Sequence, residues 1–290
     1  MDYVFMTDSN SDLPYTIKDK FDIPVVYMPY VLDGVEQYAD LGRGGENKLF
    51  YDRMREGALP VTSLLPTADY LVYFEPILEK HDLLFLAFSS QLSATIRNIY
   101  EAREMLLAKY PGRKFMVVDS MSISAPQILL ILGAHALYRD GKSMEEVAAW
   151  VEENKMRAQA WITVDDLKYL KRGGRISGAS AFFGTMLSLK PIVVMGKEGK
   201  IAPAEKVQGR QKALRLIAER TAQNIENPES QEIIIMHADA PEDAARLEEL
   251  IRQRIPELKG VMTIFVGPVI GTHCGPGTVA SAFMGKERAI

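Results

Sequence analysis

The sequence predicts an α/β protein of two domains, the first with a mainly parallel sheet flanked by helices and the second with a mixed sheet. The length of 290 residues corresponds to two domains at roughly 150 residues each. Short β-branched runs alternate with amphipathic stretches of helical period, which is the pattern of α/β folds. The composition, 47% hydrophobic and 25% charged, is that of an ordinary globular protein. We expect residues 1–158 to form the first domain and residues 159–290 the second.

In the first half, each expected strand ends in a polar turn, and helices separate the strands. The run 83–88 is continuously apolar, as a strand covered on both faces would be. The last helix of this half begins after Ser143, and Glu146 follows three residues later, which predicts a capping box. The domain boundary is expected just beyond this helix. The expected strands are 3–6, 83–88 and 115–118, and the expected helices are 68–79, 92–106, 124–139 and 144–156.

The second half has shorter helices and strand-to-strand turns, which indicate a mixed sheet. Its segment 267–277 is rich in Gly and Pro, and we expect a turn there, between a strand and an apolar helix at 279–283. The expected strands are 162–164, 191–195, 233–236 and 261–266, and the other expected helices are 165–170, 214–225 and 242–255.

Charge and cysteine content exclude several classes of protein. The chain has 34 basic and 38 acidic residues, a net charge of -4, and the signs are interspersed, so we expect no nucleic-acid partner. Cys274 is the only cysteine, which excludes an intramolecular disulfide and a multi-thiolate metal site. The N-terminus lacks the pattern of a signal peptide, and the longest apolar stretch, 128–137, is too short to cross a bilayer. We therefore expect a cytoplasmic protein without an integral membrane span.

Small hydroxylated residues end three of the expected strands, at 7–9, 89–90 and 119–120. The carboxyl ends of parallel strands lie on one edge of a sheet, where open α/β folds bind ligands. Each group alone is more often a turn former or helix cap. Their shared position at strand ends favours a ligand site at that edge.

Two loops could contact an anionic group. Thr62 and Ser63 lie between prolines ahead of a helix, and 171–175 combines Lys and Arg side chains with two glycines. The second loop suits phosphate or carboxylate recognition, although a solvated basic loop explains its composition equally well. The chain lacks both the dinucleotide fingerprint and the phosphate-loop pattern, which disfavours a nicotinamide enzyme and a nucleotide hydrolase.

His273 stands in the Gly- and Pro-rich segment. Its imidazole and nearby backbone amides could face a ligand at a helix N-terminus, or His273 could hydrogen-bond the backbone in a purely structural turn. We weigh these two interpretations equally. The other histidines show no metal-ligand spacing, so no metal is expected. Hydrolase chemistry is a minor alternative, because no nucleophile elbow is present.

Together these motifs resemble the DegV family of bacterial fatty-acid-binding proteins. The matching segments keep their order over nearly the whole chain. They are 7–14, Thr62 and Ser63 with Pro66, 89–93, 118–120, 164–176, 189–191 and 271–277.

The resemblance implies a carrier, not a catalyst, that buries one long-chain fatty acid between its domains and uses no cofactor. In members that work with a fatty acid kinase, the kinase phosphorylates the bound carboxylate with ATP to an acyl-phosphate for phospholipid synthesis. By this resemblance the carboxylate contacts fall on Thr62 and Ser93, with His273 nearby. Ser63, Arg172, Arg210 and Thr272 are expected in supporting or partner-facing positions.

The chain departs from the family pattern at Ala94, Gln208 and Cys274. Gln208 stands where an arginine is common, and it bears on the kinase-facing role more than on binding. Two alternatives stay open: a stand-alone enzyme, or a regulatory module, acting on another anionic amphiphile. Apolar residues that could line the tail pocket, with ordinary core packing as the alternative, are Phe182, Phe183, Met186 and Leu187.

Overall fold

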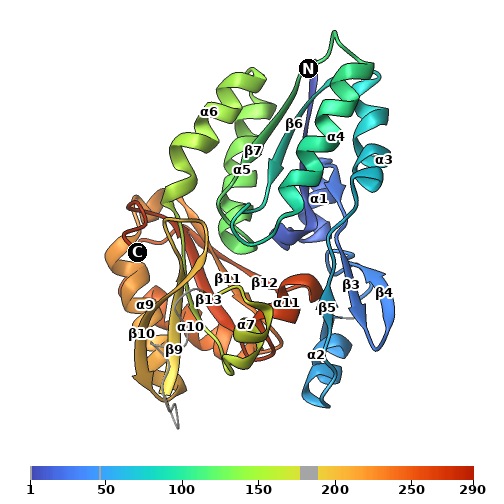
Figure 1. The fold of residues 1–290 in the computed structure, drawn as a ribbon. Helices are drawn as coiled ribbons and strands as arrows, with labels where there is room; N and C mark the ends of the chain where they lie inside the picture. Colours follow the sequence, from blue (N-terminus) through green and yellow to red (C-terminus); the bar gives the residue numbers. More distant parts are fainter. Residues whose placement is uncertain (1, 46, 177–188) are drawn as a thin grey trace.

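The first half of the chain is built on a four-stranded parallel sheet (Figure 1). The computed structural model describes residues 2–45, 47–176 and 189–290. The three strands predicted for this half are present, and the sheet gains a short edge strand. In spatial order the strands are β2 (Val25–Val26), β1 (Tyr3–Asp8), β6 (Asp82–Ala87) and β7 (Phe115–Asp119).

Helices cover both faces of this parallel sheet. The pair α3 (Thr67–Leu78) and α4 (Thr95–Lys109) packs on one face, and the pair α5 (Ala125–Arg139) and α6 (Met144–Asn154) on the other. The predicted capping box of α6 is confirmed: the Glu146 amide donates to Ser143 Oγ at 3.2 Å, and the Ser143 amide donates to Glu146 Oε2 at 2.8 Å. Short helices complete this half at η1 (Ser9–Ser11), α1 (Tyr15–Phe21) and η2 (Lys155–Arg157).

A small antiparallel sheet, not predicted from the sequence, stands beside the parallel one. It consists of β3 (Pro29–Leu32), β4 (Val35–Tyr38) and the two-residue β5 (Val61–Thr62), and α2 (Asn47–Arg55) lies below it in Figure 1. Because β5 pairs with β3, Thr62 has a fixed place at the end of a strand.

The second half is built on a six-stranded mixed sheet, as predicted. Its only parallel pair among the described strands is β11 with β12. The helices α9 (Arg210–Asn224) and α10 (Pro241–Arg254) cover one face. In spatial order the strands are β10 (Ile201–Gln208), β9 (Leu189–Met195), β8 (Ala158–Thr163), β13 (Val279–Met284), β11 (Glu232–His237) and β12 (Gly260–Phe265), and η3 (Pro228–Ser230) precedes β11.

Two predictions for the second half were wrong. Residues 279–283 form not a helix but β13, a central strand paired with β8 and β11. The expected turn within 267–277 contains a helix, α11 (Pro268–Cys274), because Pro268 occupies the first helical position, where its missing N–H costs nothing. The helix expected at 165–170 is also displaced, to α7 (Lys168–Gly173).

Helix α5 joins the two halves. It packs against β1 and α6 on one side and against β8, β11 and β13 on the other. Its buried residues lie all around the helix and include Gln127 and His135, so it is enclosed by both sheets. One hydrophobic cluster therefore extends through both halves, while a second fills the space between the mixed sheet, α9 and α10.

Arg288 ties the end of the chain to both halves. Its guanidinium donates to the Met121 carbonyl at 2.7 Å, to Ser122 Oγ at 2.6 Å and to the Ala158 carbonyl at 2.9 Å. Burial lowers the pKa of Arg288 to about 10. The proposed domain boundary, between residues 158 and 159, falls at the start of β8.

Candidate functional site

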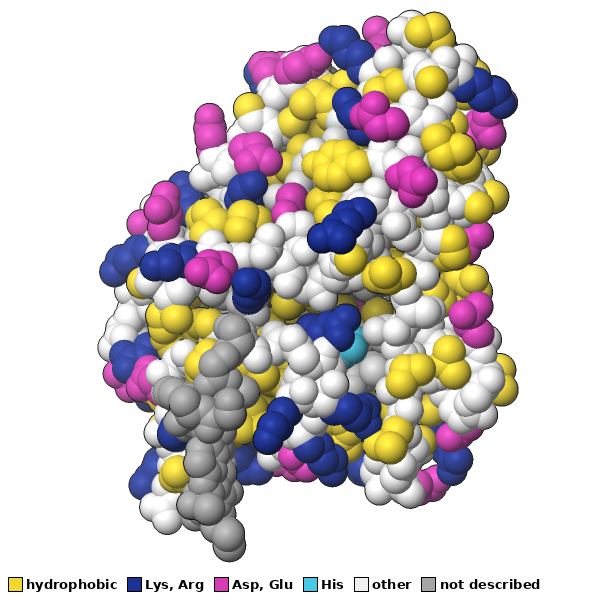
Figure 2. Space-filling model, in the orientation of Figure 1, with side chains coloured by type: hydrophobic (Ala, Val, Ile, Leu, Met, Phe, Trp, Pro, Cys, Tyr) yellow, Lys and Arg dark blue, Asp and Glu magenta, His cyan; other side chains and the backbone are white. Residues whose placement is uncertain are grey.

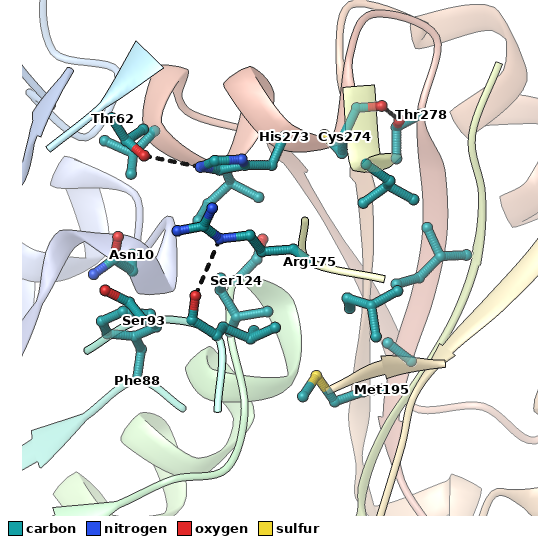
Figure 3. A pocket seen from close by; sticks show the side chains of 18 of the residues that line it. Asn10, Thr62, Phe88, Ser93, Ser124, Arg175, Met195, His273, Cys274 and Thr278 are labelled. Atoms are coloured by element: carbon teal, nitrogen blue, oxygen red, sulfur yellow. Dashed lines mark hydrogen bonds between the residues drawn. The ribbon is translucent and has the colours of Figure 1, made fainter. Parts of the chain in front are cut away.

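A largely apolar cavity lies where the two halves meet (Figure 3). It encloses about 1120 Å³ of space free of atoms, counting the part open to solvent. Both halves contribute to its wall, and most of the side chains are apolar. The lining residues are Asn10, Met28, Thr62, Ser63, Leu64, Phe88, Leu92, Ser93, Thr95, Ile123, Ser124, Pro126, Ala160, Ile162, Val164, Leu170, Arg175, Val193, Met195, Ile201, Met236, Val269, Ile270, His273, Cys274 and Thr278.

The hydroxyls at the strand ends do not line this cavity. Ser9 Oγ accepts from the Met28 amide, Ser89 Oγ donates to the Gly199 carbonyl and Ser120 Oγ donates to the Ser122 carbonyl. They therefore act as turn and loop formers. The cavity wall comes instead from residues just beside these turns, such as Asn10, Phe88 and Ser124.

Thr62 and His273 form the central polar contact of the cavity. Thr62 Oγ1 lies 2.9 Å from His273 Nε2, as Figure 3 shows. Burial, and then the charges of Arg175 and Arg172, lower the pKa of His273 to about 4. The imidazole is therefore neutral at neutral pH, with one nitrogen donating and the other accepting. Among the described residues, the buried His273 Nδ1 has no hydrogen-bond partner.

The position of His273 follows from the packing of α11. A Cβ on Gly271 would lie 2.4 Å from Tyr51 Oη, so α11 approaches α2 closely only because residue 271 is glycine. Tyr51 Oη donates to the Val266 carbonyl at 2.9 Å, just before α11 begins. His273 lies in the last turn of α11, so the proposed contact of a ligand with a helix N-terminus at this residue was wrong.

Ser93 and Ser63 also line the cavity. Ser93 Oγ accepts from the Thr95 amide at 3.2 Å and lies 3.2 Å from Thr95 Oγ1, at the beginning of α4. Asn10, which also lines the cavity, has a buried Nδ2 without a partner among the described residues. The structure thus brings Thr62, Ser93 and His273 to one cavity.

Arg175 places a guanidinium in the cavity, and sequence reasoning did not select it as a site residue. Its Nε donates to the Leu92 carbonyl at 3.2 Å and its Nη1 donates to the Gly173 carbonyl. Figure 3 shows the guanidinium between the Thr62 and His273 pair and Ser93. The basic loop 171–175 had indicated recognition of an anionic group, and it contains both Arg172 and Arg175.

Arg172, the arginine that was predicted, is exposed and does not line the cavity. Its Nη2 lies 3.4 Å from the Pro60 carbonyl and 3.5 Å from the Thr272 carbonyl, and its guanidinium lies over the ring of Tyr169. Arg172 therefore stands at the surface beside the Thr62 and His273 pair.

Two further predicted residues, Arg210 and Thr272, do not line the cavity. Arg210 pairs with Asp243 at 2.7 Å, and the Thr272 hydroxyl donates to the Pro268 carbonyl within α11. The residues predicted for the tail pocket, Phe182, Phe183, Met186 and Leu187, lie outside the described residues.

Two buried carboxylates lie behind the cavity wall. Asp8 accepts from the amides of Asn10 and Phe88, each at 3.0 Å, and burial raises its pKa to about 6. Asp12 accepts from Ser124 Oγ at 2.5 Å and from the Gly267 amide at 2.9 Å, and burial raises its pKa to about 7. Asp12 thus connects η1, α5 and the start of α11.

Neither metal nor thiol chemistry has support in the described part of the chain. No group of three or more His, Cys, Asp or Glu side chains there could hold a metal ion. Burial raises the pKa of Cys274 to about 12, so its sulfur is a thiol and not a nucleophilic thiolate. No helix within 2–45, 47–176 or 189–290 is long and apolar enough to cross a membrane.

Sequence comparison relates nearly the whole chain to known proteins. The model of a family described as "Uncharacterised protein, DegV family COG1307" matches residues 4–286. A DegV domain-containing protein of Clostridium perfringens is 38% identical over 287 residues, which cover 99% of this chain and 98% of the relative.

Solved structures share the fold over its full length. A DegV family protein from Thermus thermophilus, whose structure is described as showing fatty acid binding, is 31% identical with a TM-score of 0.84, covering 98% of this chain and 100% of that one. DegV of Bacillus subtilis, described as a fatty acid binding protein, is 27% identical with a TM-score of 0.82, covering 99% and 100%.

Proposed function

Because the chain belongs to the DegV family, we propose that it binds one long-chain fatty acid in the cavity between its halves and presents the carboxylate to a separate fatty acid kinase. The observation that carries this proposal is an apolar cavity with Thr62, His273, Ser93 and Arg175 gathered on its wall. Solved structures of DegV proteins that are described as fatty acid binding support the same ligand class.

The apolar wall suits the acyl tail. A tail of about 16 carbons, at roughly 0.8 kcal/mol per buried methylene, gives a gross gain of about 12 kcal/mol, from which the cost of ordering is subtracted. The tail therefore supplies most of the affinity.

The polar groups suit the carboxylate. A carboxylate removed from water needs several donors at once, because an unpaired buried charge is very costly. The hydroxyls of Thr62 and Ser93 and the guanidinium of Arg175 can donate to it, and so can an imidazole N–H of His273. Ser63 is a further donor beside Thr62.

In the proposed transfer, a carboxylate oxygen attacks the terminal phosphorus of ATP, and ADP leaves with the electrons of the broken P–O bond. This chain is the carrier, without catalysis of its own, and the kinase holds the nucleotide. Exposed Arg172, at the edge of the head-group site, is proposed to face the kinase. Gln208, at the end of β10, stands where the family resemblance led us to expect an arginine, and we propose that it affects the kinase-facing role more than binding. We place this exchange in the cytoplasm.

The experiment is to denature the purified protein, extract it with organic solvent and search the extract for fatty acids by mass spectrometry. The delipidated protein is then titrated with palmitate and oleate. Ala160→Phe serves as a blocked-cavity variant. Its ring enters the cavity from β8 and should weaken fatty acid binding, and thermal melts verify that the variant is folded. No lipid in the extract and no binding of either acid would reject the proposal.

A further inference from the structure

A second pocket lies between the small antiparallel sheet and α3, and we call it the tyrosine pocket. Figure 2 shows the hollowed region between the two halves, where a histidine reaches the surface, and the tyrosine pocket shares no lining residue with the cavity there. It encloses about 710 Å³ of space free of atoms, counting the part open to solvent. The residues that line it are Tyr27, Tyr38, Ala39, Asp40, Arg43 and Tyr73.

The pairing of β3 with β4 gathers three of these side chains on one face. Tyr38 lies opposite Pro29, and a further backbone hydrogen bond continues this register beyond the strands, which places Asp40 opposite Tyr27. Opposite residues of an antiparallel pair project to the same face, and so do alternate residues of one strand. Tyr27, Tyr38 and Asp40 therefore project together. Met28, the intervening residue, projects to the other face and lines the cavity between the halves.

Tyr73 completes the pocket from α3. Its hydroxyl accepts from the Tyr27 amide at 3.4 Å. Burial raises the pKa of this phenol, and the neighbouring Tyr38, Tyr27 and Asp69 raise it further. The three phenols are thus close enough to influence one another, in surroundings that disfavour a further negative charge. The same surroundings favour a cation.

Asp40 supplies a negative charge at the pocket. Its carboxylate accepts from the Gly42 amide at 2.8 Å and also from the Gly44 amide. These neutral donors hold the carboxylate in place and leave its charge unneutralised. Arg43 also lines the pocket, but its guanidinium pairs with Asp19, which offsets its charge. The pocket thus presents one carboxylate beside three aromatic rings.

We propose that the tyrosine pocket binds a quaternary ammonium cation of the choline class. The face of an aromatic ring is negative and attracts a cation, and a group of such rings is how proteins commonly recognise quaternary ammonium groups. A quaternary ammonium has no N–H to donate, so rings can surround it without leaving a donor unpaired. The Asp40 carboxylate adds Coulomb attraction. Tyr38 is 49% exposed, which leaves the pocket accessible to a ligand from solvent.

The experiment titrates choline against the full chain by ligand-observed NMR. The comparison ligand is the uncharged isostere of choline, in which a tert-butyl group replaces trimethylammonium, and it should bind at least about fivefold more weakly. Tyr38→Leu and Asp40→Asn should each weaken choline binding about threefold to fivefold. Tyr100→Leu is the matched control, because Tyr100 is a similarly exposed tyrosine on α4, outside the pocket. It should bind choline as wild type does.

The outcomes are distinct from those for the fatty acid. Undetectable choline binding, equal affinity for choline and its uncharged isostere, or equal losses in Tyr38→Leu and Tyr100→Leu would each overturn the site. Palmitate affinity should be unchanged in Tyr38→Leu, because the two sites share no lining residue, so failure here leaves the proposed function intact.

Vesicle flotation identifies the source of the cation. Flotation with phosphatidylcholine vesicles but not with phosphatidylglycerol vesicles, reversed by choline and lost in Tyr38→Leu, would support the site with a lipid head group as its ligand. Choline binding without flotation would support the site with a free cation as its ligand.

Discussion

The hydroxyl oxygen of Thr62 lies 2.9 Å from Nε2 of His273, although 211 residues separate them in the sequence. Thr62 ends a two-residue strand of the small sheet, and His273 lies in the last turn of α11. The contact connects the two halves of the chain at the cavity, and substitutions of either residue should therefore affect ligand binding before they affect folding.

We predict that Thr62→Val lowers palmitate affinity about tenfold, because valine keeps the shape but removes one hydrogen bond to a charged head group. Fluorescence competition on delipidated protein measures the change. Thr67→Val is the control, since the Thr67 hydroxyl donates to Glu101 at the surface, outside the cavity. Equal affinities for wild type and Thr62→Val would remove Thr62 from the site.

Ser93→Ala should lower palmitate affinity by a factor of about ten or more, since a hydrogen bond to a charged group contributes about 1.5 to 3 kcal/mol. It should also cost about 1 kcal/mol of unfolding free energy, because Ser93 Oγ accepts from the Thr95 amide at the start of α4. Titration and urea unfolding separate the two effects. A loss of stability with full affinity would assign Ser93 to helix capping alone.

Asp12→Asn should change how stability depends on pH. Burial raises the pKa of folded Asp12 from 3.8 to about 7, so between these values the folded state holds a proton that the unfolded state lacks. The stabilisation by the protonated form is therefore present below the lower value and lost as pH rises through about 7. The amide that replaces the carboxyl group can still accept from the Gly267 amide and donate to Ser124, without titrating.

Urea unfolding at about pH 4 and about pH 8 tests this. The unfolding free energy of Asp12→Asn relative to wild type should rise by about 3 kcal/mol between the two conditions. Asp8 and His273 also titrate in this range, but both proteins retain them, so the difference isolates Asp12. A difference independent of pH would contradict the raised pKa.

Arg288→Met should destabilise the protein by about 3 kcal/mol, because it leaves several buried acceptors without a donor. The affected groups are the carbonyls of Met121 and Ala158 and the hydroxyl of Ser122. Arg246→Met is the control: Arg246 forms an exposed pair with Glu249 on α10, worth less than about 1 kcal/mol. If thermal melts show an equally small loss of stability for both variants, Arg288 has no structural role.

Local sequence patterns suffice for the parallel strands and for α6, since apolar runs and the Ser143 cap encode them directly. They fail for residues 279–283. Small and apolar residues without a polar face fit a buried helix or a buried strand equally well. Pairing with β8 and β11 decides in favour of the strand, and those partners are distant in sequence.

The cavity shows a similar limit. Resemblance to a family directed attention to Thr62, Ser93 and His273, and the fold brings all three to one wall. It pointed to Arg172, whereas Arg175 is the arginine that lines the cavity. That choice depends on α7 ending at Gly173 and on Gly174, whose φ of 66° turns the chain so that Arg175 enters the cavity. Such a turn follows from tertiary packing and not from composition.

The hydrophobic cluster that extends through both halves includes much of the cavity wall, with Phe88, Ile162 and Met195 among its members. An acyl chain in the cavity would therefore form part of the protein interior, although it is exchangeable and is not encoded in the sequence. Unfolding free energy would then rise with the free concentration of lipid, by mass action. Empty molecules would be the first to unfold and to be degraded. The cellular amount of this protein would in this way follow the supply of its own ligand.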